Sequence, residues 1–250
     1  MNALPGKLVW VEHASADPAK ASQFYETLFG WTDSPMDVAG SPYRVIMNAG
    51  QGIGGYRTAR GGEPGHWGIY LSVADVDATF AMALVAGATP WMPPSDFPPV
   101  GRGASLIDPV GAMFSIWRGA NDDTPDAEVP PGHWVWHELH ATDAEKALAF
   151  YEQLFGLTHD ATPAGDGTYY VLKAGELRRG GIMKTPGTSG KSLWLPYVLV
   201  PDVDAATAKA ALLHAEVCMH PSDIPGIGRF ATLRDPLGAV FAVFLPQPRQ

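Results

Sequence analysis

The chain carries one sequence pattern twice. Residues 9–30 and 135–156 are identical at 12 of 22 positions without a gap. Later motifs of the first copy recur in the same order in the second: Gly54-Gly55 as Gly180-Gly181, Asp75-Val76-Asp77 as Asp202-Val203-Asp204, Gly101-Arg102 as Gly228-Arg229, and Asp108-Pro109 as Asp235-Pro236. Such a repeat predicts two copies of one fold that pack together and share or duplicate a site.

The length and composition support two folded copies. A chain of 250 residues, of which 46% are hydrophobic, can bury two ordinary cores. The repeat predicts one core in each copy and domains at residues 5–119 and 132–246. Residues 120–131 lie in a polar, acidic and proline-rich stretch, which predicts a linker.

The charge and the cysteine content narrow the class of protein. A net charge of −9 argues against nucleic-acid and membrane partners, both of which favour clustered Lys and Arg, and favours a small neutral or cationic molecule as the expected ligand. The single cysteine, Cys218, excludes intrachain disulfides and thiolate-cluster metal sites. The sequence shows neither a signal-peptide pattern nor an apolar run long enough to span a membrane. We therefore expect a cytoplasmic protein, and the sequence leaves open whether it forms a homodimer.

Each copy reads as strand, helix and three strands, and this order occurs twice in each copy. Residues 8–15 predict a strand. A helix then begins after Asp17, with Pro18 in its first turn and Gly30 at its end. The same reasoning predicts helices at 75–86, 143–155 and 202–217. Each copy is thus predicted to contain two βαβββ units.

Three recurring motifs carry a family resemblance. They are an aspartate followed by FY-x(2)-LFG, then W-x(2)-Y-x(2)-V-x-D-x-D, and finally GR-x(5)-DP-x-G-A-x-F. They cover nearly the whole chain except the linker and resemble the vicinal oxygen chelate superfamily, which includes glyoxalase I, bleomycin-resistance proteins and extradiol dioxygenases. The tandem glyoxalase-like branch, which contains an actinobacterial culture-filtrate antigen and proteins labelled hydroxylases, looks most similar.

The resemblance implies an α+β fold of four βαβββ units, which form two tandem glyoxalase-like domains with incomplete barrels. The ligand is expected inside each barrel and the helices outside. Enzymes of this superfamily usually hold a divalent metal ion there. The resemblance places the four ligand positions at Trp10, Gly68, Ser115 and Gly54-Gly55 in the first copy, and at Trp136, Leu195, Ala242 and Gly180-Gly181 in the second. Because none of these side chains is a usual metal ligand, we expect no metal site and no cofactor.

Strand alternation predicts which side chains face the two cavities. Side chains two apart on a strand share a face, and the resemblance turns the face of the first tryptophan inward. The predicted ligand-binding residues are Trp10, Glu12 and Tyr70 in the first copy and Trp136 and Tyr197 in the second. Rings with a few polar tips suit a flat, partly aromatic small molecule.

Glu138 and His140 share one strand face and are the candidate catalytic pair for general acid–base chemistry. The alternative, which we favour, is that Glu12 and Glu138 accept hydrogen bonds from tyrosine hydroxyls or backbone amides and hold the barrel in shape. If chemistry occurs, we expect it in the second copy, because Ala14 stands where that copy has His140.

Other polar residues are assigned structural roles. Arg102 and Arg229 are expected to form salt bridges with nearby aspartates. Most histidines without a counterpart in the other copy, including His13 and His133, are expected at the surface or in loops. The glycine run at 50–55 is expected to form a turn between two strands, because it does not open a helix as a dinucleotide-binding loop does.

Three functions remain open from the sequence. The first is a metal-free protein that binds or sequesters a small molecule. The second is a metal-free lyase, isomerase or hydroxylase that uses Glu138 and His140. The third is a glyoxalase- or dioxygenase-type metalloenzyme whose ligands are rebuilt from Glu12, Glu138 and His140, which needs at least one further ligand in each site.

Overall fold

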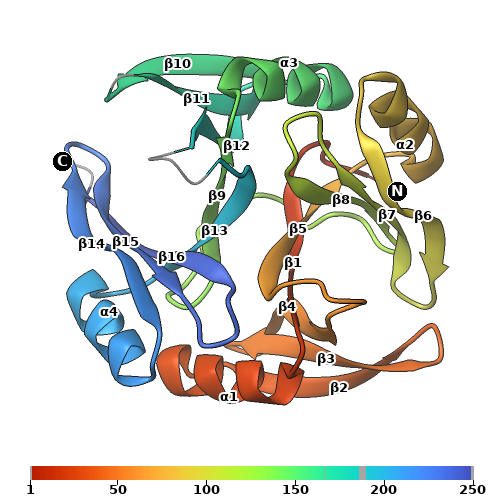
Figure 1. The fold of residues 1–250 in the computed structure, drawn as a ribbon. Coiled ribbons are helices and arrows are strands. Elements are labelled where there is room, and N and C mark those ends of the chain that lie inside the picture. Colours follow the sequence, from red (N-terminus) through yellow and green to blue (C-terminus); the bar gives the residue numbers. More distant parts are fainter. Residues whose placement is uncertain (1, 166, 186–189, 249–250) are drawn as a thin grey trace.

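The computed structural model describes residues 2–165, 167–185 and 190–248. In this part of the chain each half forms a curled eight-stranded sheet with its two helices outside (Figure 1). The first half contains β1 (Leu8–Ser15), α1 (Pro18–Phe29), β2 (Thr32–Val38), β3 (Ser41–Asn48), β4 (Gln51–Thr58), β5 (His66–Ser72), α2 (Val76–Val85), β6 (Thr89–Phe97), β7 (Gly101–Ile107) and β8 (Met113–Gly119). The second half contains β9 (Trp134–Ala141), α3 (Ala144–Phe155), β10 (Thr158–Ala164), β11 (Gly167–Ala174), β12 (Leu177–Lys184), β13 (Leu193–Leu199), α4 (Val203–Leu212), β14 (Glu216–Ile224), β15 (Gly228–Arg234) and β16 (Val240–Pro246). The predicted α+β fold of four βαβββ units is confirmed.

The strand order shows how the units join. It is β2-β3-β4-β1-β5-β8-β7-β6 in the first half and β10-β11-β12-β9-β13-β16-β15-β14 in the second. In each sheet the two units meet where their first strands pair antiparallel, β1 with β5 and β9 with β13. The units therefore pair within each half.

The helix boundaries follow from local signals. Asp17 caps α1 by accepting a hydrogen bond from the Lys20 backbone N–H at 3.0 Å, and Gly30 ends the helix in the left-handed conformation at φ 77°. Helix α4 is shorter than predicted, because it ends at Leu212 and His214 takes the left-handed conformation at φ 68°. Residues 216–224, partly assigned to the helix from the sequence, form β14.

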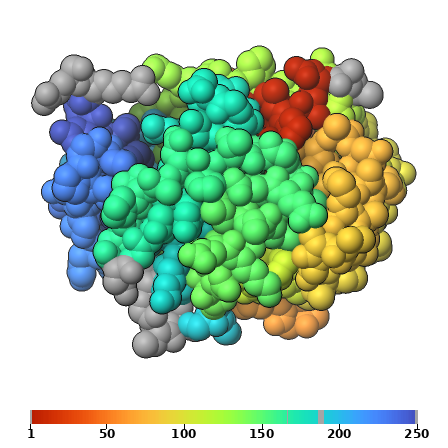
Figure 2. Space-filling model, turned by 90° about the horizontal axis from the view of Figure 1, so that it is seen from above, coloured from red at the N-terminus to blue at the C-terminus, as the bar shows by residue number. Residues whose placement is uncertain are grey.

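The two large cores lie between the halves, which corrects the expectation of one core in each copy. In Figure 1, α1 lies beside α4 and α3 lies near α2, so each helix pair joins one unit of each half. Figure 2 shows the same neighbourhood from above, with the green α3 region against the gold region of α2. Each sheet curls around the interior of its own half. The convex side of the sheet and the helices on it therefore bury their apolar faces against the other half. One core includes Ala21, Phe24, Tyr25, Leu28, Val198, Val203, Phe241 and Val243, and the other includes Ile69, Val76, Phe114, Leu139, Phe150, Tyr151 and Trp194.

The recurring motifs meet at these two cores. Trp67 Nε1 donates to the Tyr25 hydroxyl at 2.8 Å, and the Tyr25 hydroxyl donates to the carboxylate of Asp235 in the other half at 2.9 Å. The equivalent contact also runs from the second half to the first, since the Tyr151 hydroxyl donates to the carboxylate of Asp108 at 2.9 Å. The FY and DP motifs of the two copies therefore bind one another across the interface between the halves.

A buried histidine distinguishes the Tyr25–Asp235 bridge between the halves from the Tyr151–Asp108 bridge. His13 is fully buried, contrary to the expectation of a surface or loop position, and its Nε2 lies 2.7 Å from Asp235 Oδ2. Burial favours a higher pKa for Asp235, but the hydrogen bond and charge of His13 hold that pKa below its usual value. Leu139 stands at the equivalent position of the other bridge, where burial raises the pKa of Asp108. His133, also expected at the surface, is buried too.

The predicted linker region is tied to both halves. Asp126 forms ion pairs with Lys7 of the first half at 3.1 Å and with Arg179 of the second at 2.9 Å. Asp123 accepts hydrogen bonds from the Leu4 backbone N–H and the Ser72 hydroxyl. Among the residues that the structure describes, no helix has the length and apolar character needed to cross a membrane.

Candidate functional site

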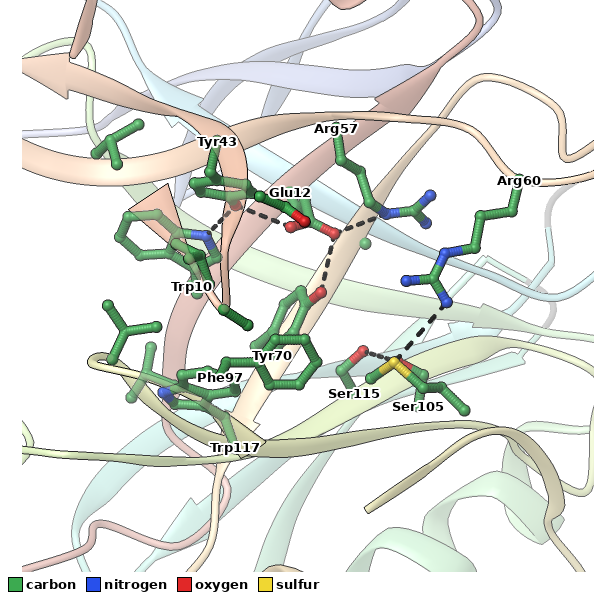
Figure 3. Close-up of a pocket in the computed structure, with 18 of the residues that line it drawn as sticks. Trp10, Glu12, Tyr43, Arg57, Arg60, Tyr70, Phe97, Ser105, Ser115 and Trp117 are labelled. Atoms are coloured by element: carbon green, nitrogen blue, oxygen red, sulfur yellow. Dashed lines mark hydrogen bonds and ion pairs between the residues drawn. The ribbon is translucent and has the colours of Figure 1, made fainter. Parts of the chain in front are cut away.

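A cavity of about 590 Å³ opens on the concave side of the first half's sheet. Figure 3 shows rings and polar side chains from several strands turned toward it. Its polar residues include Glu12, Arg57, Arg60, Ser105 and Ser115. Its aromatic residues are Trp10, Tyr43, Tyr70, Trp91, Phe97, Phe114 and Trp117.

The pairing of β1 with β5 places the predicted residues of the first copy on one wall. Trp10 lies opposite Tyr70 in register, and Glu12 lies opposite Gly68. Trp10, Glu12 and Tyr70 all line the cavity. Their contact with a ligand stays a prediction.

Glu12 lies at the centre of a hydrogen-bond network. Its Oε1 accepts from the Tyr43 hydroxyl at 2.8 Å, and its Oε2 accepts from Arg57 Nε at 2.7 Å and from the Tyr70 hydroxyl at 2.9 Å. Trp10 Nε1 in turn donates to the Tyr43 oxygen at 3.0 Å. Burial raises the pKa of Tyr43 and Tyr70 well above its usual value, and the negative charge of Glu12 adds to this. Both phenols are therefore held as neutral donors.

Glu138 repeats this network in the second half. Its Oε2 accepts from the Tyr169 hydroxyl at 2.9 Å, and its Oε1 accepts from the Tyr197 hydroxyl at 2.7 Å. Trp136 Nε1 donates to the Tyr169 oxygen at 2.8 Å, as Trp10 does to Tyr43. The predicted hydrogen bonds from tyrosines to both glutamates are present.

The nitrogen-bearing side chain beside each glutamate comes from a different strand in the two halves. His140 Nε2 lies 2.7 Å from Glu138 Oε1, whereas Arg57 supplies the positive charge beside Glu12. In register, Ala14 faces Arg57 in the first half and His140 faces Met183 in the second. Burial favours a higher pKa for Glu138, but the hydrogen bond and charge of His140 lower it. His140 thus occupies the structural role that Arg57 has in the first half.

The repeated glycine pair makes room for the tyrosines. The turn predicted at residues 50–55 is confined to the residues before β4, because Gly52, Gly54 and Gly55 lie within that strand. A Cβ atom at Gly55 would overlap the Tyr43 hydroxyl, and one at Gly181 would overlap the Tyr169 hydroxyl. The glycines are needed because each hydroxyl crosses the strand to reach its glutamate.

The corresponding interior of the second half is filled by apolar side chains. Leu195 takes the register position of Gly68 opposite the glutamate, and it is 1% exposed. It packs in a cluster with Tyr197 and Ala242, which includes the rings of Phe230 and Phe244. The two interiors therefore differ more than the sequence predicted.

The remaining predicted residues lie elsewhere or pair with other groups. Trp136 lines a second cavity, of about 1420 Å³, which lies between the halves and beneath residues 124–130. Arg102 and Arg229 form the expected salt bridges, to Asp77 at 2.8 Å and Asp204 at 2.7 Å. Neither Glu138 nor His140 lines the cavity of the first half or the cavity between the halves.

The residues at the positions where the resemblance places the superfamily's metal ligands are not usual ligands of a metal ion. In the first cavity these positions hold Trp10, Gly68 and Ser115, and the Ser115 hydroxyl is hydrogen-bonded to Ser105 at 2.8 Å. The Glu12 carboxylate is occupied by three donors, one of which is the cationic Arg57. Among the described residues, no three His, Cys, Asp or Glu are grouped to hold a metal ion.

Two tyrosines of the glutamate networks were not predicted from the sequence, although the repeat carried a signal for them. Tyr43 and Tyr169 are 126 residues apart, the same separation as Glu12 and Glu138. Arg57 has no such signal, because Met183 stands at its place in the second copy.

Comparison with known proteins finds a matching family model and similar proteins that are covered over nearly their whole length. Residues 10–117 match the family model described as "Glyoxalase-like domain". The chain is 36% identical over 248 residues to "Putative glyoxylase CFP32" of Mycobacterium tuberculosis, with 96% of this chain and 95% of that protein covered. It is 31% identical over 257 residues to "Anthracycline biosynthesis protein DauV" of Streptomyces sp. strain C5, with 96% and 93% covered.

A solved glyoxalase structure shares the fold. The solved structure of a Mn(II)-bound glyoxalase from Novosphingobium aromaticivorans superposes with a TM-score of 0.68 at 17% identity, covering 97% of this chain and 83% of that one. At this identity the likeness concerns the fold alone. The relatives that match over nearly the whole chain show that it belongs to the glyoxalase-like family.

Proposed function

We propose that the protein binds a flat, partly aromatic small molecule in the cavity of the first half. The observation that carries this proposal is the composition of the wall, where rings from Trp10, Tyr43, Tyr70 and Trp117 surround a space of about 590 Å³. Aromatic side chains offer a large apolar contact area, and a few polar tips orient the bound molecule. The name of the relative DauV adds support, because anthracyclines are fused-ring aromatic compounds.

We also propose that this binding uses no metal ion. The reason is the chemistry of the donors, since Glu12 is saturated by two phenols and a guanidinium. A divalent cation bound at Glu12 would displace these donors and lie beside the positive charge of Arg57.

Binding of N-phenyl-1-naphthylamine, a neutral fluorescent aromatic probe, tests the proposal. A Cβ atom at Gly68 has room, with its nearest neighbour, the Glu12 carbonyl oxygen, at 3.7 Å. The second half carries Leu195 at this position. Gly68→Leu is therefore expected to fill the cavity and weaken probe binding at least about tenfold, measured by fluorescence titration.

Gly167→Leu is the matched control, because a Cβ atom there meets only the Ala164 carbonyl oxygen at 3.9 Å, away from the cavity. It is expected to bind the probe as the wild type does. Absence of binding to the wild type, or equal binding by Gly68→Leu, contradicts the proposal.

A second candidate function is acid–base catalysis in the second half. It is favoured by the 2.7 Å contact between His140 Nε2 and Glu138 Oε1. The His140 side chain in this contact is 16% exposed to solvent. A histidine that is held by a carboxylate and reaches solvent can transfer protons. The structural role of the same contact is separated from this one by the His140 substitutions described in the Discussion.

A further inference from the structure

Arg60 is a charged residue of the cavity that the network around Glu12 does not use. It follows β4 and lines the same cavity as Tyr70, Ser105 and Ser115. Figure 3 shows its guanidinium turned inward from the rim. The side chain's hydrogen bond in the described structure runs from Nη1 to the Met92 sulfur at 3.9 Å. A thioether is a weak acceptor, so this contact leaves the guanidinium's main donor capacity free.

The other charges on this wall are paired with one another. Arg57 donates through Nη1 and Nη2 to the two oxygens of Glu63, both at 2.7 Å, and through Nε to Glu12. His66 Nε2 lies 3.5 Å from Glu63 Oε1. Within the described residues, Arg60 forms no salt bridge through its side chain, so its positive charge is available to a bound molecule.

The repeat shows that the fold itself does not require this arginine. In the sequence of the second copy, Pro186 stands 126 residues after Arg60, the separation that relates Glu138 to Glu12. The half with the open cavity thus carries a cation at a position where the other copy has an uncharged residue.

From the free guanidinium at the rim of a ring-walled cavity, we infer that the ligand carries an acidic group on its aromatic system and that Arg60 binds this group. The planar fork of N–H donors matches a carboxylate or sulfonate and also binds an ionised phenol. The rings hold the apolar body of the ligand, and Arg60 favours an anionic ligand over a neutral ligand of the same shape. This inference rests on the proposed function.

Two probes that differ by one charged group test the inference. N-Phenyl-1-naphthylamine is neutral, and 8-anilino-1-naphthalenesulfonate has the same ring system with an added sulfonate. Arg60→Gln is expected to weaken binding of the sulfonate probe about tenfold and to change binding of the neutral probe less than about twofold. Added salt is expected to weaken only the sulfonate probe in the wild type.

Arg118→Gln is the matched control. Arg118 lies on β8, does not line the cavity, and donates a long hydrogen bond to the Asn2 carbonyl oxygen at 3.4 Å. It is expected to leave both probes unaffected.

The outcomes separate the two proposals. If Arg60→Gln weakens both probes equally, the guanidinium stacks on rings and does not bind an anion, and the inference is wrong. It is also wrong if Arg60→Gln leaves the sulfonate probe unchanged while Gly68→Leu still blocks both probes. If the wild type binds neither probe, or if Gly68→Leu blocks neither, the proposed function fails as well.

Discussion

Replacing Asp235 with alanine is expected to lower the free energy of unfolding by about 3–5 kcal/mol at neutral pH. Asp235 is buried, and its Oδ2 accepts hydrogen bonds from Tyr25 at 2.9 Å and His13 at 2.7 Å. Both donors belong to the other half, and both would be left buried without this acceptor. Chemical denaturation followed by circular dichroism and by tryptophan fluorescence measures the loss.

Asp223→Ala is the control for this substitution. Asp223 forms an ion pair with Arg229 at 3.0 Å on the surface, with its own side chain 72% exposed, so its loss is expected to change stability little. If the two substitutions destabilise the protein equally, the bridge between Asp235 and the first half does not have the predicted importance.

The pH dependence gives a second check of the same bridge. Because the folded-state pKa of Asp235 is lowered, its contribution to stability is present above the unfolded-state pKa of about 3.9 and is lost as the pH falls through the folded-state value. The penalty of Asp235→Ala should therefore stay constant from about pH 7 down to about pH 4 and shrink as the pH falls further, through the folded-state pKa. The contribution of Asp108 to stability has the opposite pH dependence, because the folded-state pKa of Asp108 is raised. This contribution is largest below the unfolded-state pKa and is lost as the pH rises through the folded-state pKa. A penalty for Asp235→Ala that does not change with pH contradicts the assigned role of His13.

The fold was predictable because its signals are local and occur twice. The cap at Asp17 and the terminal glycine at position 30 both lie within a few residues of the helix that they define. The end of α4 was missed because His214 takes the left-handed role that glycine usually has. Its counterpart in the first copy, Gly87 at φ 96°, marks the end of α2 and was the available clue.

The candidate site was predictable only on the first strand of each unit, which gave Trp10 and Glu12 on β1 and Tyr70 on β5. Alternation on β1 placed Trp10 and Glu12 on one face, but Arg57 reaches Glu12 from β4, and no local pattern gives the register of two parallel strands. The position of the cores depends on how the two halves pack, which no pattern within one copy reveals. The recurrence of the tyrosine and aspartate motifs reflects contacts between the copies, such as that of Tyr25 with Asp235.

Replacing His140 with alanine is expected to lower the free energy of unfolding by about 3 kcal/mol, because the buried carboxylate of Glu138 loses its contact with the His140 imidazole. The first half shows how this loss can be repaired. Arg57 faces Ala14 and reaches Glu12 at 2.7 Å, and Met183 is the residue that faces His140. Adding Met183→Arg to His140→Ala should therefore restore most of the lost stability, as measured by chemical denaturation.

The double variant also separates the structural role of His140 from a catalytic one. Arginine stays protonated at neutral pH, so it can neutralise Glu138 but cannot accept a proton from a substrate. If His140 transfers protons, the double variant should be as stable as the wild type and yet lack its turnover. If His140 acts only as a countercharge, any activity should return together with stability. A double variant that is no more stable than His140→Ala would contradict the equivalence of the two networks, because that equivalence requires an arginine at position 183 to reach Glu138 as Arg57 reaches Glu12.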